Sequence, residues 1–283
     1  MVSYNDLFYF VELAQTLNFS RAAERIGISQ PSLSAAVKRL ERFVGAELFL
    51  RDKHKVLLTQ AGKNLFSHSR QLLLLWDNTK ASCLDSQNEV QGSITFGCHT
   101  SIALYFLPKF LPKLIEQYPN LEINLKHDLS RKIAEEIINY TVDIGIVVNP
   151  VKHPDLIIKK LFDDKVSCWQ AADFKPAKEK INIICDPSLN QTQWLLKKLR
   201  SAKFQYHKLI TTSSLETIAN LTAAGAGIGI VPTRIITSLH HHSVKQVPHT
   251  PFYHDEICVV YRHENRNMKA VKTVAKDIRD VVV

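Results

Sequence analysis

The segment from Ser29 to Val44 constrains the fold of this chain more than any other. Its apolar residues recur at helical spacing, so one face of a helix would be buried. Ser29 can cap that helix, and Pro31 falls in the first turn, where its missing N–H does no harm. The residues expected on the buried face are Leu33, Val37, Leu40 and Val44. The residues expected on the opposite face are Pro31, Ala35, Lys38 and Arg42, with Gln30 and Ser34 on the flank.

Two further helices are predicted before this segment and two short strands after it. Ser3 and Asp6 have the spacing of a capping box at the start of the first helix. The second helix is expected from Ser20, as its N-cap, to Ile26, with Gly27 ending it. Residues 47–51 and 55–59 read as strands joined by a basic turn at residues 52–54. Three helices and a two-stranded wing predict a mainly α winged helix-turn-helix over residues 1–58.

The exposed face of the third helix has the chemistry that DNA requires. Small residues permit close approach, amides and hydroxyls can contact base edges, and cations can contact phosphates. The candidate DNA-binding residues are Ser29, Gln30, Pro31, Ser32, Ser34, Lys38, Arg39, Arg51, Lys53 and Lys55. The alternative is a three-helix bundle whose polar face is merely solvated.

A long helix is predicted after Thr59, its N-cap, and is expected to reach about Ser86. Its apolar positions are Leu65, Leu72, Leu73, Leu75, Trp76 and Leu84. An isolated helix cannot bury such a stripe, so it must pack on its own domain or pair with a second copy. Residues 59–91 are therefore expected to form this helix, in one of these two arrangements, followed by a polar hinge.

Residues 92–283 alternate between strand and helix patterns, which predicts an α/β domain with parallel sheets. Such sheets bind ligands beyond the carboxyl ends of their strands. Polar residues follow several of the predicted strands. They are Thr100, Ser101, Ser130, Asn149, Thr212 and Ser213, with Val148 closing one strand. Ser213 also has capping-box spacing with Glu216. Each hydroxyl could instead serve only as a helix cap.

Several motifs closely resemble the DNA-binding signature of LysR-type transcriptional regulators. They are Phe19-Ser-Arg-Ala-Ala-Glu, Ser29-Gln-Pro-Ser-Leu-Ser, Gly45-x-x-Leu-Phe-x-Arg51 and Leu58-Thr-x-Ala-Gly62. A looser resemblance to the family's effector domain includes Val142-Asp-Ile-Gly-Ile146 and Ala223-Ala-Gly-Ala-Gly-Ile-Gly-Ile-Val-Pro232. Two positions depart from the family pattern. Ala35 replaces a longer polar residue and contributes little to base readout, and Val148 removes a charge that some members carry near there.

The resemblance implies a DNA-binding transcriptional regulator modulated by a small-molecule effector. It also implies that residues 59–91 form a dimerisation helix and hinge, in which the helix pairs with that of a second copy. Its effector domain would resemble periplasmic binding proteins, with one subdomain at residues 92–162 and 266–283 and another at 163–265. The effector would bind between them, with the family's positions falling best on Thr100, Ser101, Ser130 and Thr212. Carboxylates are the first effector class to consider. The implied partners are double-stranded DNA and RNA polymerase, and the implied assembly is a homodimer or homotetramer. No membrane association is implied.

Composition narrows the remaining classes. The net charge of +9 fits a polyanionic partner, and no transmembrane segment or signal peptide is evident, so a cytoplasmic protein is expected. No catalytic residue, cofactor or metal site is predicted: phosphate-loop and nucleophile motifs are absent, and the five cysteines have no zinc spacing. The histidine run at 240–242 lies in a polar loop, and Cys98 is expected to be a buried small residue rather than an oxidant sensor. The competing interpretation is a solute-binding or enzymatic α/β protein with an accessory helix-turn-helix.

Overall fold

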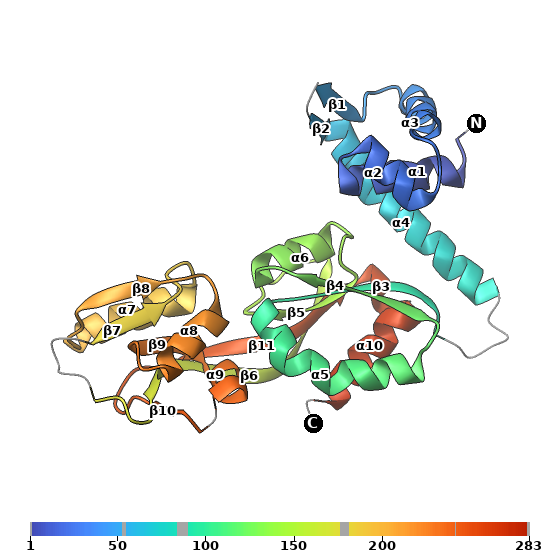
Figure 1. Cartoon of the computed structure of the whole chain (residues 1–283). Helices are drawn as coiled ribbons and strands as arrows, with labels where there is room; N and C mark the ends of the chain where they lie inside the picture. Colours follow the sequence, from blue (N-terminus) through green and yellow to red (C-terminus); the bar gives the residue numbers. More distant parts are fainter. Residues whose placement is uncertain (1, 53–54, 84–89, 176–180, 241, 282–283) are drawn as a thin grey trace. The chain divides into compact units, whose positions relative to one another are not determined.

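The computed structural model describes residues 2–52, 55–83, 90–175, 181–240 and 242–281 (Figure 1). Internal contacts divide the chain into two compact units. The first unit comprises Met1–Gly92 with Asn139–Thr141, and the second comprises Ser93–Ile138 with Val142–Val283. No helix within the described residues is long and apolar enough to cross a membrane.

The first unit contains a three-helix cluster, a two-stranded wing and a long helix. Its elements are α1 (Tyr4–Thr16), α2 (Phe19–Ile26), α3 (Gln30–Val44), β1 (Phe49–Asp52), β2 (Lys55–Leu58) and α4 (Gln60–Cys83). The predicted capping box of Ser3 and Asp6 is present at α1, and Gly27 ends α2 in the left-handed conformation. The predicted cap of α2 was wrong, because the Asn18 side chain, not Ser20, accepts the free N–H of Arg21.

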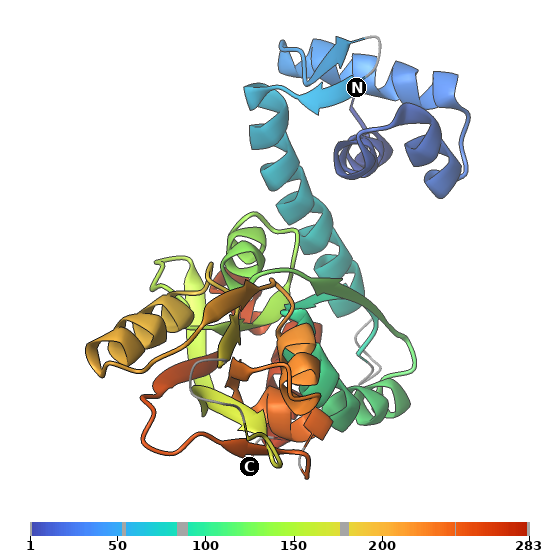
Figure 2. The ribbon, with the colours of Figure 1, turned by 60° about the vertical axis from the view of Figure 1, so that its left-hand side comes forward.

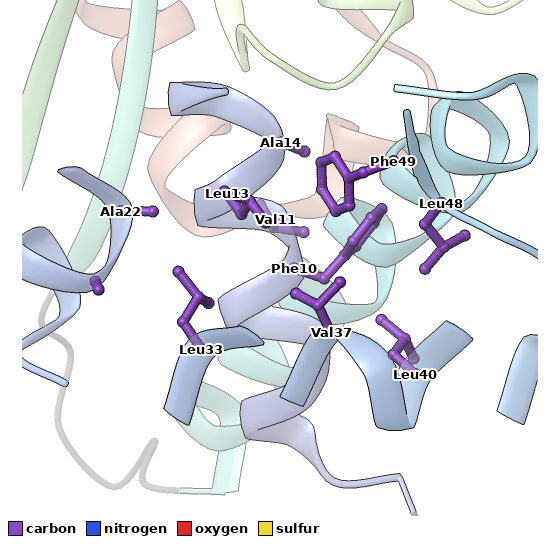
Figure 3. Packing of buried hydrophobic residues seen from close by; sticks show 11 residues of the cluster. Phe10, Val11, Leu13, Ala14, Ala22, Leu33, Val37, Leu40, Leu48 and Phe49 are labelled. Atoms are coloured by element: carbon purple, nitrogen blue, oxygen red, sulfur yellow. The ribbon is translucent and has the colours of Figure 1, made fainter. Parts of the chain in front are cut away.

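The three helices bury one apolar core (Figure 3). Leu33, Val37 and Leu40 of α3 are fully buried there as predicted, beside Phe10 of α1. Val44 is 42% exposed, so its predicted place in the core was wrong. The helix reaches its C-cap at Gly45, which is left-handed with φ of 76°, and the chain then returns to the core. The buried residues that follow this turn are Leu48 and Phe49.

The wing is an antiparallel pair whose register runs from Phe49 opposite Leu58 to Asp52 opposite Lys55. Lys53 and His54, the predicted tip, lie outside the described residues. The hydroxyl of Thr59 accepts the Gly62 N–H at 2.9 Å, as expected for a cap of α4. Gly62 lacks a Cβ where one would overlap the carbonyl oxygen of Leu48, so α4 can pack directly on the backbone that leads into the wing.

The second unit is built on a nine-stranded mixed sheet, ordered β4-β3-β5-β11-β6-β9-β7-β8 with β10 beside β6. The strands are β3 (Gly92–Cys98), β4 (Leu121–His127), β5 (Ile144–Val148), β6 (Leu156–Ala171), β7 (Asn182–Cys185), β8 (Lys208–Thr211), β9 (Ile228–Pro232), β10 (Val244–Gln246) and β11 (Tyr253–Arg262). The predicted parallel pairing occurs between β3 and β5 and among β7, β8 and β9. The central strands β6 and β11 are instead antiparallel to their neighbours.

Helices cover this sheet. They are α5 (Thr100–Gln117), α6 (Ser130–Ile138), α7 (Asn190–Ser201), α8 (Leu215–Ala223), α9 (Thr233–His240), the 3₁₀ helix η2 (Glu264–Asn267) and α10 (Lys269–Asp280). We call β3, β4 and β5 with α5, α6 and α10 the first half. We call β7, β8, β9 and β10 with α7, α8 and α9 the second half. The helices α8 and α9 lie side by side in Figure 2, in orange, and contact each other.

Strands β6 and β11 connect the two halves. The second part of β11, from Ile257 to Tyr261, pairs with β5 of the first half. Its first part pairs with β6 near the stretch of β6 that meets β9 of the second half. The register shifts between Ile257 and Cys258, and Ile257 lies opposite Phe162. We therefore propose that the two expected subdomains exchange near residues 162 and 257, rather than at 162 and 265.

Candidate nucleic-acid interface and effector site

The N-terminus of α3 is ordered by two serines. The hydroxyl of Ser29 accepts the backbone N–H of Ser32 at 3.3 Å, and the two hydroxyl oxygens lie 2.8 Å apart. Both residues are exposed, as are Gln30 and Pro31 in the same turn. This first turn therefore presents polar groups to solvent on a rigid, capped backbone.

Farther along α3, the exposed residues are Ala35, Lys38 and Arg42, as predicted, and Ser34 is half-buried. Glu41 is turned away from this strip, because its Oε1 accepts the backbone N–H of Leu48 at 3.0 Å. The only acid of α3 is thus used to hold the start of the wing. The strip that remains exposed is small, polar and cationic.

Arg39, a predicted DNA contact, also has a structural role. Its Nη2 lies 2.6 Å from Oδ1 of Asp6, which is 2% exposed on α1. Burial raises the pKa of Asp6. Hydrogen bonds from the Ser3 amide and the Arg39 guanidinium lower it by more, so the net pKa lies below its ordinary value. The ion pair joins α3 to α1, a contact that spacing within either helix does not reveal.

In the described part of the wing, Lys55 of β2 is an exposed cation. The side chain of Arg51, and Lys53 altogether, lie outside the described residues, so their predicted contacts stay predictions.

In the second unit, the N-terminus of α5 is capped by a residue that the sequence interpretation missed. His99 Nδ1 accepts the backbone N–H of Ser101 at 3.2 Å and lies 2.8 Å from the Ser101 hydroxyl. Ser101 is 1% exposed, whereas Thr100 is exposed. Of the two hydroxyls predicted at this helix start, that of Ser101 is therefore already bound to an imidazole.

His99 marks the place where the ends of both halves approach each other. Burial lowers its pKa below the ordinary value, which favours the neutral ring that accepts from Ser101. The charges of Glu216, Asp186 and Asp128 act against this shift. Asp128 follows β4 in the first half, while Asp186 follows β7 and Glu216 lies on α8, both in the second half. The strand ends of the two halves thus face a common, acidic region.

Two of the remaining predicted hydroxyls, those of Ser130 and Thr212, accept backbone N–H groups. Ser130 accepts the N–H of Val148 at 3.1 Å, which fixes the end of β5 against α6. Thr212 accepts the N–H of Ser214 at 3.2 Å. Ser214, not Ser213, caps α8, so the predicted capping role of Ser213 was wrong; its own side chain is exposed.

Asn149 binds across the sheet rather than standing free at its edge. Its Nδ2 donates to Oδ1 of Asp255 at 2.7 Å, and its Oδ1 accepts the backbone N–H of Glu256 at 2.8 Å. Asp255 is 2% exposed, and burial raises its pKa to about 6. Sequence reasoning missed Asp255, because it is the middle residue of the polar run His254-Asp-Glu256 and nothing in that run marks it as the buried one.

Two other predicted features can be placed. Cys98 is fully buried 3.7 Å from Nδ1 of His127, and burial raises the pKa of its thiol to about 12. It is therefore not an activated thiolate. Among the described residues, no group of three or more His, Cys, Asp or Glu side chains is placed to hold a metal ion.

The first unit is a winged helix-turn-helix that exposes a cationic helix. The second unit of the same chain is an α/β domain whose two halves meet at their strand ends. Together they define a ligand-responsive DNA-binding regulator. Comparison with known families specifies it. Residues 4–63 match the family of bacterial regulatory helix-turn-helix proteins of the lysR type, and residues 87–282 match the LysR substrate binding domain. The chain belongs to the LysR family of transcriptional regulators, which bind DNA and an effector and are not enzymes.

Relatives agree with this assignment. The chain is 36% identical over 172 residues to the Hca operon transcriptional activator HcaR of Escherichia coli, an alignment that covers 61% of this chain and 58% of HcaR. It is 26% identical over 300 residues to the hydrogen peroxide-inducible genes activator of Haemophilus influenzae, covering 99% of each.

Solved structures share the fold over the whole chain. A full-length OxyR variant from Pseudomonas aeruginosa superposes with a TM-score of 0.75 at 25% identity, covering 99% of this chain and 95% of that one. LysG from Corynebacterium glutamicum with bound effector Arg gives 0.67 at 15% identity, covering 99% and 98%. CbnR complexed with its target DNA gives 0.62 at 18% identity, covering 99% of each.

Proposed function

We propose that this regulator binds its operator as a homodimer, with α3 of each copy in the major groove and each wing along the phosphate backbone. The exposed strip of α3, which presents Gln30, Lys38 and Arg42 while Glu41 faces the wing, is the observation that carries this proposal. The amide is suited to base edges and the cations to phosphates or guanine. CbnR, which has the same fold, has been solved with its target DNA.

The second copy is expected to cover α4. Three large apolar side chains of this helix are exposed in the single chain: Leu72 by 54%, Leu75 by 64% and Trp76 by 52%. A polar-backed helix gains stability by pairing such a stripe with its counterpart in another copy. Dimerisation would also set the spacing of two DNA half-sites. Both a dimer and a tetramer built from such dimers satisfy this requirement.

The experiment that tests DNA docking compares two lysines. Lys38→Ala should lower operator affinity about 5- to 150-fold, as expected for losing a base or phosphate contact worth about 1–3 kcal/mol. Lys272→Ala, an exposed position on α10, removes the same charge from the other unit and should leave affinity unchanged. Binding should also weaken steeply with salt. Equal affinities for the two variants, or a flat salt response, would count against α3 as the reading helix.

We propose further that a small-molecule effector binds where the two halves meet, near Thr100, Ser101 and His99. A carboxylate is favoured by the helix N-terminus of α5, whose dipole stabilises negative charge. The three acids that act on His99 favour a ligand that also carries a cationic group. An amino acid should therefore bind better than a simple carboxylate. Effector binding would change the placement of the paired DNA-binding domains and their contact with RNA polymerase.

A thermal-shift screen tests the effector proposal directly. The panel pairs each small carboxylate with the amino acid of the same carbon skeleton, so that only the ammonium group differs. A rise in melting temperature with the amino acid and not with its partner supports the proposal. Stronger stabilisation by the plain carboxylates would move the preference back to an anion alone, and no response to either class would remove the proposed ligand chemistry.

A further inference from the structure

The imidazole of His99 occupies both hydrogen-bond donors of Ser101 at the start of α5. Its Nδ1 accepts the Ser101 backbone N–H at 3.2 Å and lies 2.8 Å from the Ser101 hydroxyl oxygen. A backbone N–H can only donate, so Nδ1 is an acceptor and the ring proton lies on Nε2; the hydroxyl must therefore donate to Nδ1 as well. Ser101 is 1% exposed. Neither donor of Ser101 is open to a ligand while the ring stays in place.

A neutral imidazole is a weak acceptor for this position. The usual N-cap residues are Ser, Thr, Asp and Asn, whose side-chain oxygens accept the same backbone N–H. A carboxylate does so through a charge-assisted bond and is stabilised by the positive end of the helix dipole. The 18-residue helix α5 has no acidic residue in its first turn. A carboxylate from an effector is therefore a better acceptor for Ser101 than the ring that caps it.

A second group in this region lacks a hydrogen-bond partner. Glu216 lies in the first turn of α8, and its Oε2 accepts the Ser214 hydroxyl at 3.0 Å. Its Oε1 is buried and has no donor among the described residues. Of the acids near His99, Glu216 is the one whose charge acts most strongly on the ring. A buried carboxylate oxygen without a donor is costly, so this oxygen indicates a ligand that brings one.

These two groups belong to different halves and have complementary needs. His99 leads into α5 of the first half, whereas Glu216 lies on α8 of the second half. An amino acid carries on one carbon atom an acceptor for Ser101 and a donor for Glu216. Both protein groups are covered in this structure, so a ligand enters only when this place rearranges. The His99 ring is the group that holds Ser101.

We propose that His99 is a displaceable cap, which competes with the effector's carboxylate for Ser101 while Glu216 Oε1 accepts the effector's ammonium group. The inference rests on the proposed function in placing the effector at the start of α5. Binding requires the ring to leave Ser101, so the fraction of molecules with Ser101 free limits the apparent affinity. The chain's own imidazole thereby raises the effector concentration that is needed for a response.

The cap is tested with acetate, which supplies the carboxylate alone. Affinity is measured in the full chain from the rise in melting temperature with sodium acetate, relative to the same concentration of sodium chloride. His99→Gly removes the competing ring at little cost, because Gly is itself a tolerated N-cap. It should raise acetate affinity about 2- to 30-fold, the range that corresponds to the loss of one helix cap.

Asn18→Gly is the matched control, since it removes a side-chain cap of the same kind from α2 in the first unit. It should leave acetate affinity unchanged. Equal affinity in His99→Gly and the wild type refutes the competition. Lower affinity in His99→Gly also refutes it, because the ring would then bind the carboxylate instead of competing with it. If His99→Gly does not fold, His99→Ala makes the same comparison.

The role of Glu216 is tested with glycine, which has the carbon skeleton of acetate and adds an ammonium group. Glu216→Gln keeps an acceptor for the Ser214 hydroxyl but loses the charge. It should lower glycine affinity about tenfold and should not lower acetate affinity. Equal losses for both ligands, or no loss for glycine, overturn this role.

Failure of the cap and failure of the effector proposal give different results. If the wild type and His99→Gly bind acetate with the same affinity, the cap alone is removed and the effector site stands. If neither chain responds to acetate or glycine, the start of α5 is not the effector site and the cap falls with it. A response that appears only in His99→Gly supports the cap most strongly.

Discussion

The DNA-binding face and the effector site of this regulator are assembled in opposite ways. The first draws on one stretch of α3, where Ser29, Gln30 and Lys38 lie within three turns. The second brings together residues as distant in sequence as Asn149 and Asp255, which are 106 positions apart. A site on one helix is fixed by local spacing, whereas a site between strand ends is fixed by the topology of the sheet.

The two sites also differ in where their charges lie. The cations of α3 are exposed, so their interactions are screened by salt. Three titratable groups of the second unit, His99, Asp164 and Asp255, have pKa values that burial shifts from the ordinary ones. The DNA-binding face should therefore respond mainly to ionic strength and the effector domain to pH. Mutations in each unit offer ways to separate these responses.

The largest expected effect is on the core of the first unit. Leu33→Ala removes a fully buried side chain and should lower that unit's free energy of unfolding by about 2–5 kcal/mol. Val44→Ala, at a site 42% exposed, should cost less than about 0.5 kcal/mol. In calorimetry, Leu33→Ala should lower the melting temperature of the first unit while that of the second unit stays unchanged. A common shift of both transitions would mean that the units unfold together.

A smaller effect is expected from the ion pair behind the DNA-binding face. Arg39→Ala leaves the buried Asp6 carboxylate with its Ser3 hydrogen bonds but without its cationic partner, and should destabilise the first unit by about 1–3 kcal/mol at pH 7. Because the pKa of Asp6 is lowered, this stabilisation is present at neutral pH and lost as pH falls below the ordinary aspartate range. Denaturant melts of wild type and variant should therefore converge in acid. Lys38→Ala is the comparison, and equal destabilisation by both changes would argue against a specific Arg39–Asp6 bond.

The accuracy of the sequence-based predictions follows the same division. Caps formed within three positions were predicted correctly at Ser3, Ser29 and Thr59, because both partners lie in one short segment. The cap of α2 was placed at Ser20 instead of Asn18, since two capping residues stand close together and only the path of the chain selects one. Val44 continued the helical period but fell where α3 leaves the core.

Over longer distances, sequence reasoning found the right segments but not the partners. Ser130 and Val148 were both predicted to lie at strand ends, but the sequence did not reveal that the Ser130 hydroxyl accepts the Val148 N–H. His99 was missed because a histidine cap has no distinctive spacing. Asp255 was missed because its importance depends on lying opposite Asp164 and beside Asn149 and Gln191, which only strand register determines.

Two serine hydroxyls, of the half-buried Ser130 and the buried Ser101, offer a comparison of structural and ligand-binding roles in the effector domain. Ser130→Ala removes the acceptor for the Val148 N–H and should cost about 0.5–1.5 kcal/mol with little change in effector response. Ser101→Ala should cost a similar amount by freeing His99, but should also abolish the ligand-induced rise in melting temperature. Thermal shifts with and without the best amino acid from the screen make this comparison. An undiminished rise in Ser101→Ala would move the effector site away from the start of α5.

The smallest expected effect concerns the cysteines of the second unit, where burial should suppress reactivity. Burial raises the pKa of Cys98 and Cys168 to about 12 and that of Cys185 to about 11, and it raises that of Cys258. The thiolate is the reactive form, so at pH 8 these four thiols should be at least about tenfold slower to alkylate than in the unfolded chain. Iodoacetamide labelling followed by peptide mass spectrometry measures each site separately. Because His127 is close to Cys98, this thiol gives the strictest test: labelling at the unfolded rate would show that the imidazole activates it and that burial does not dominate.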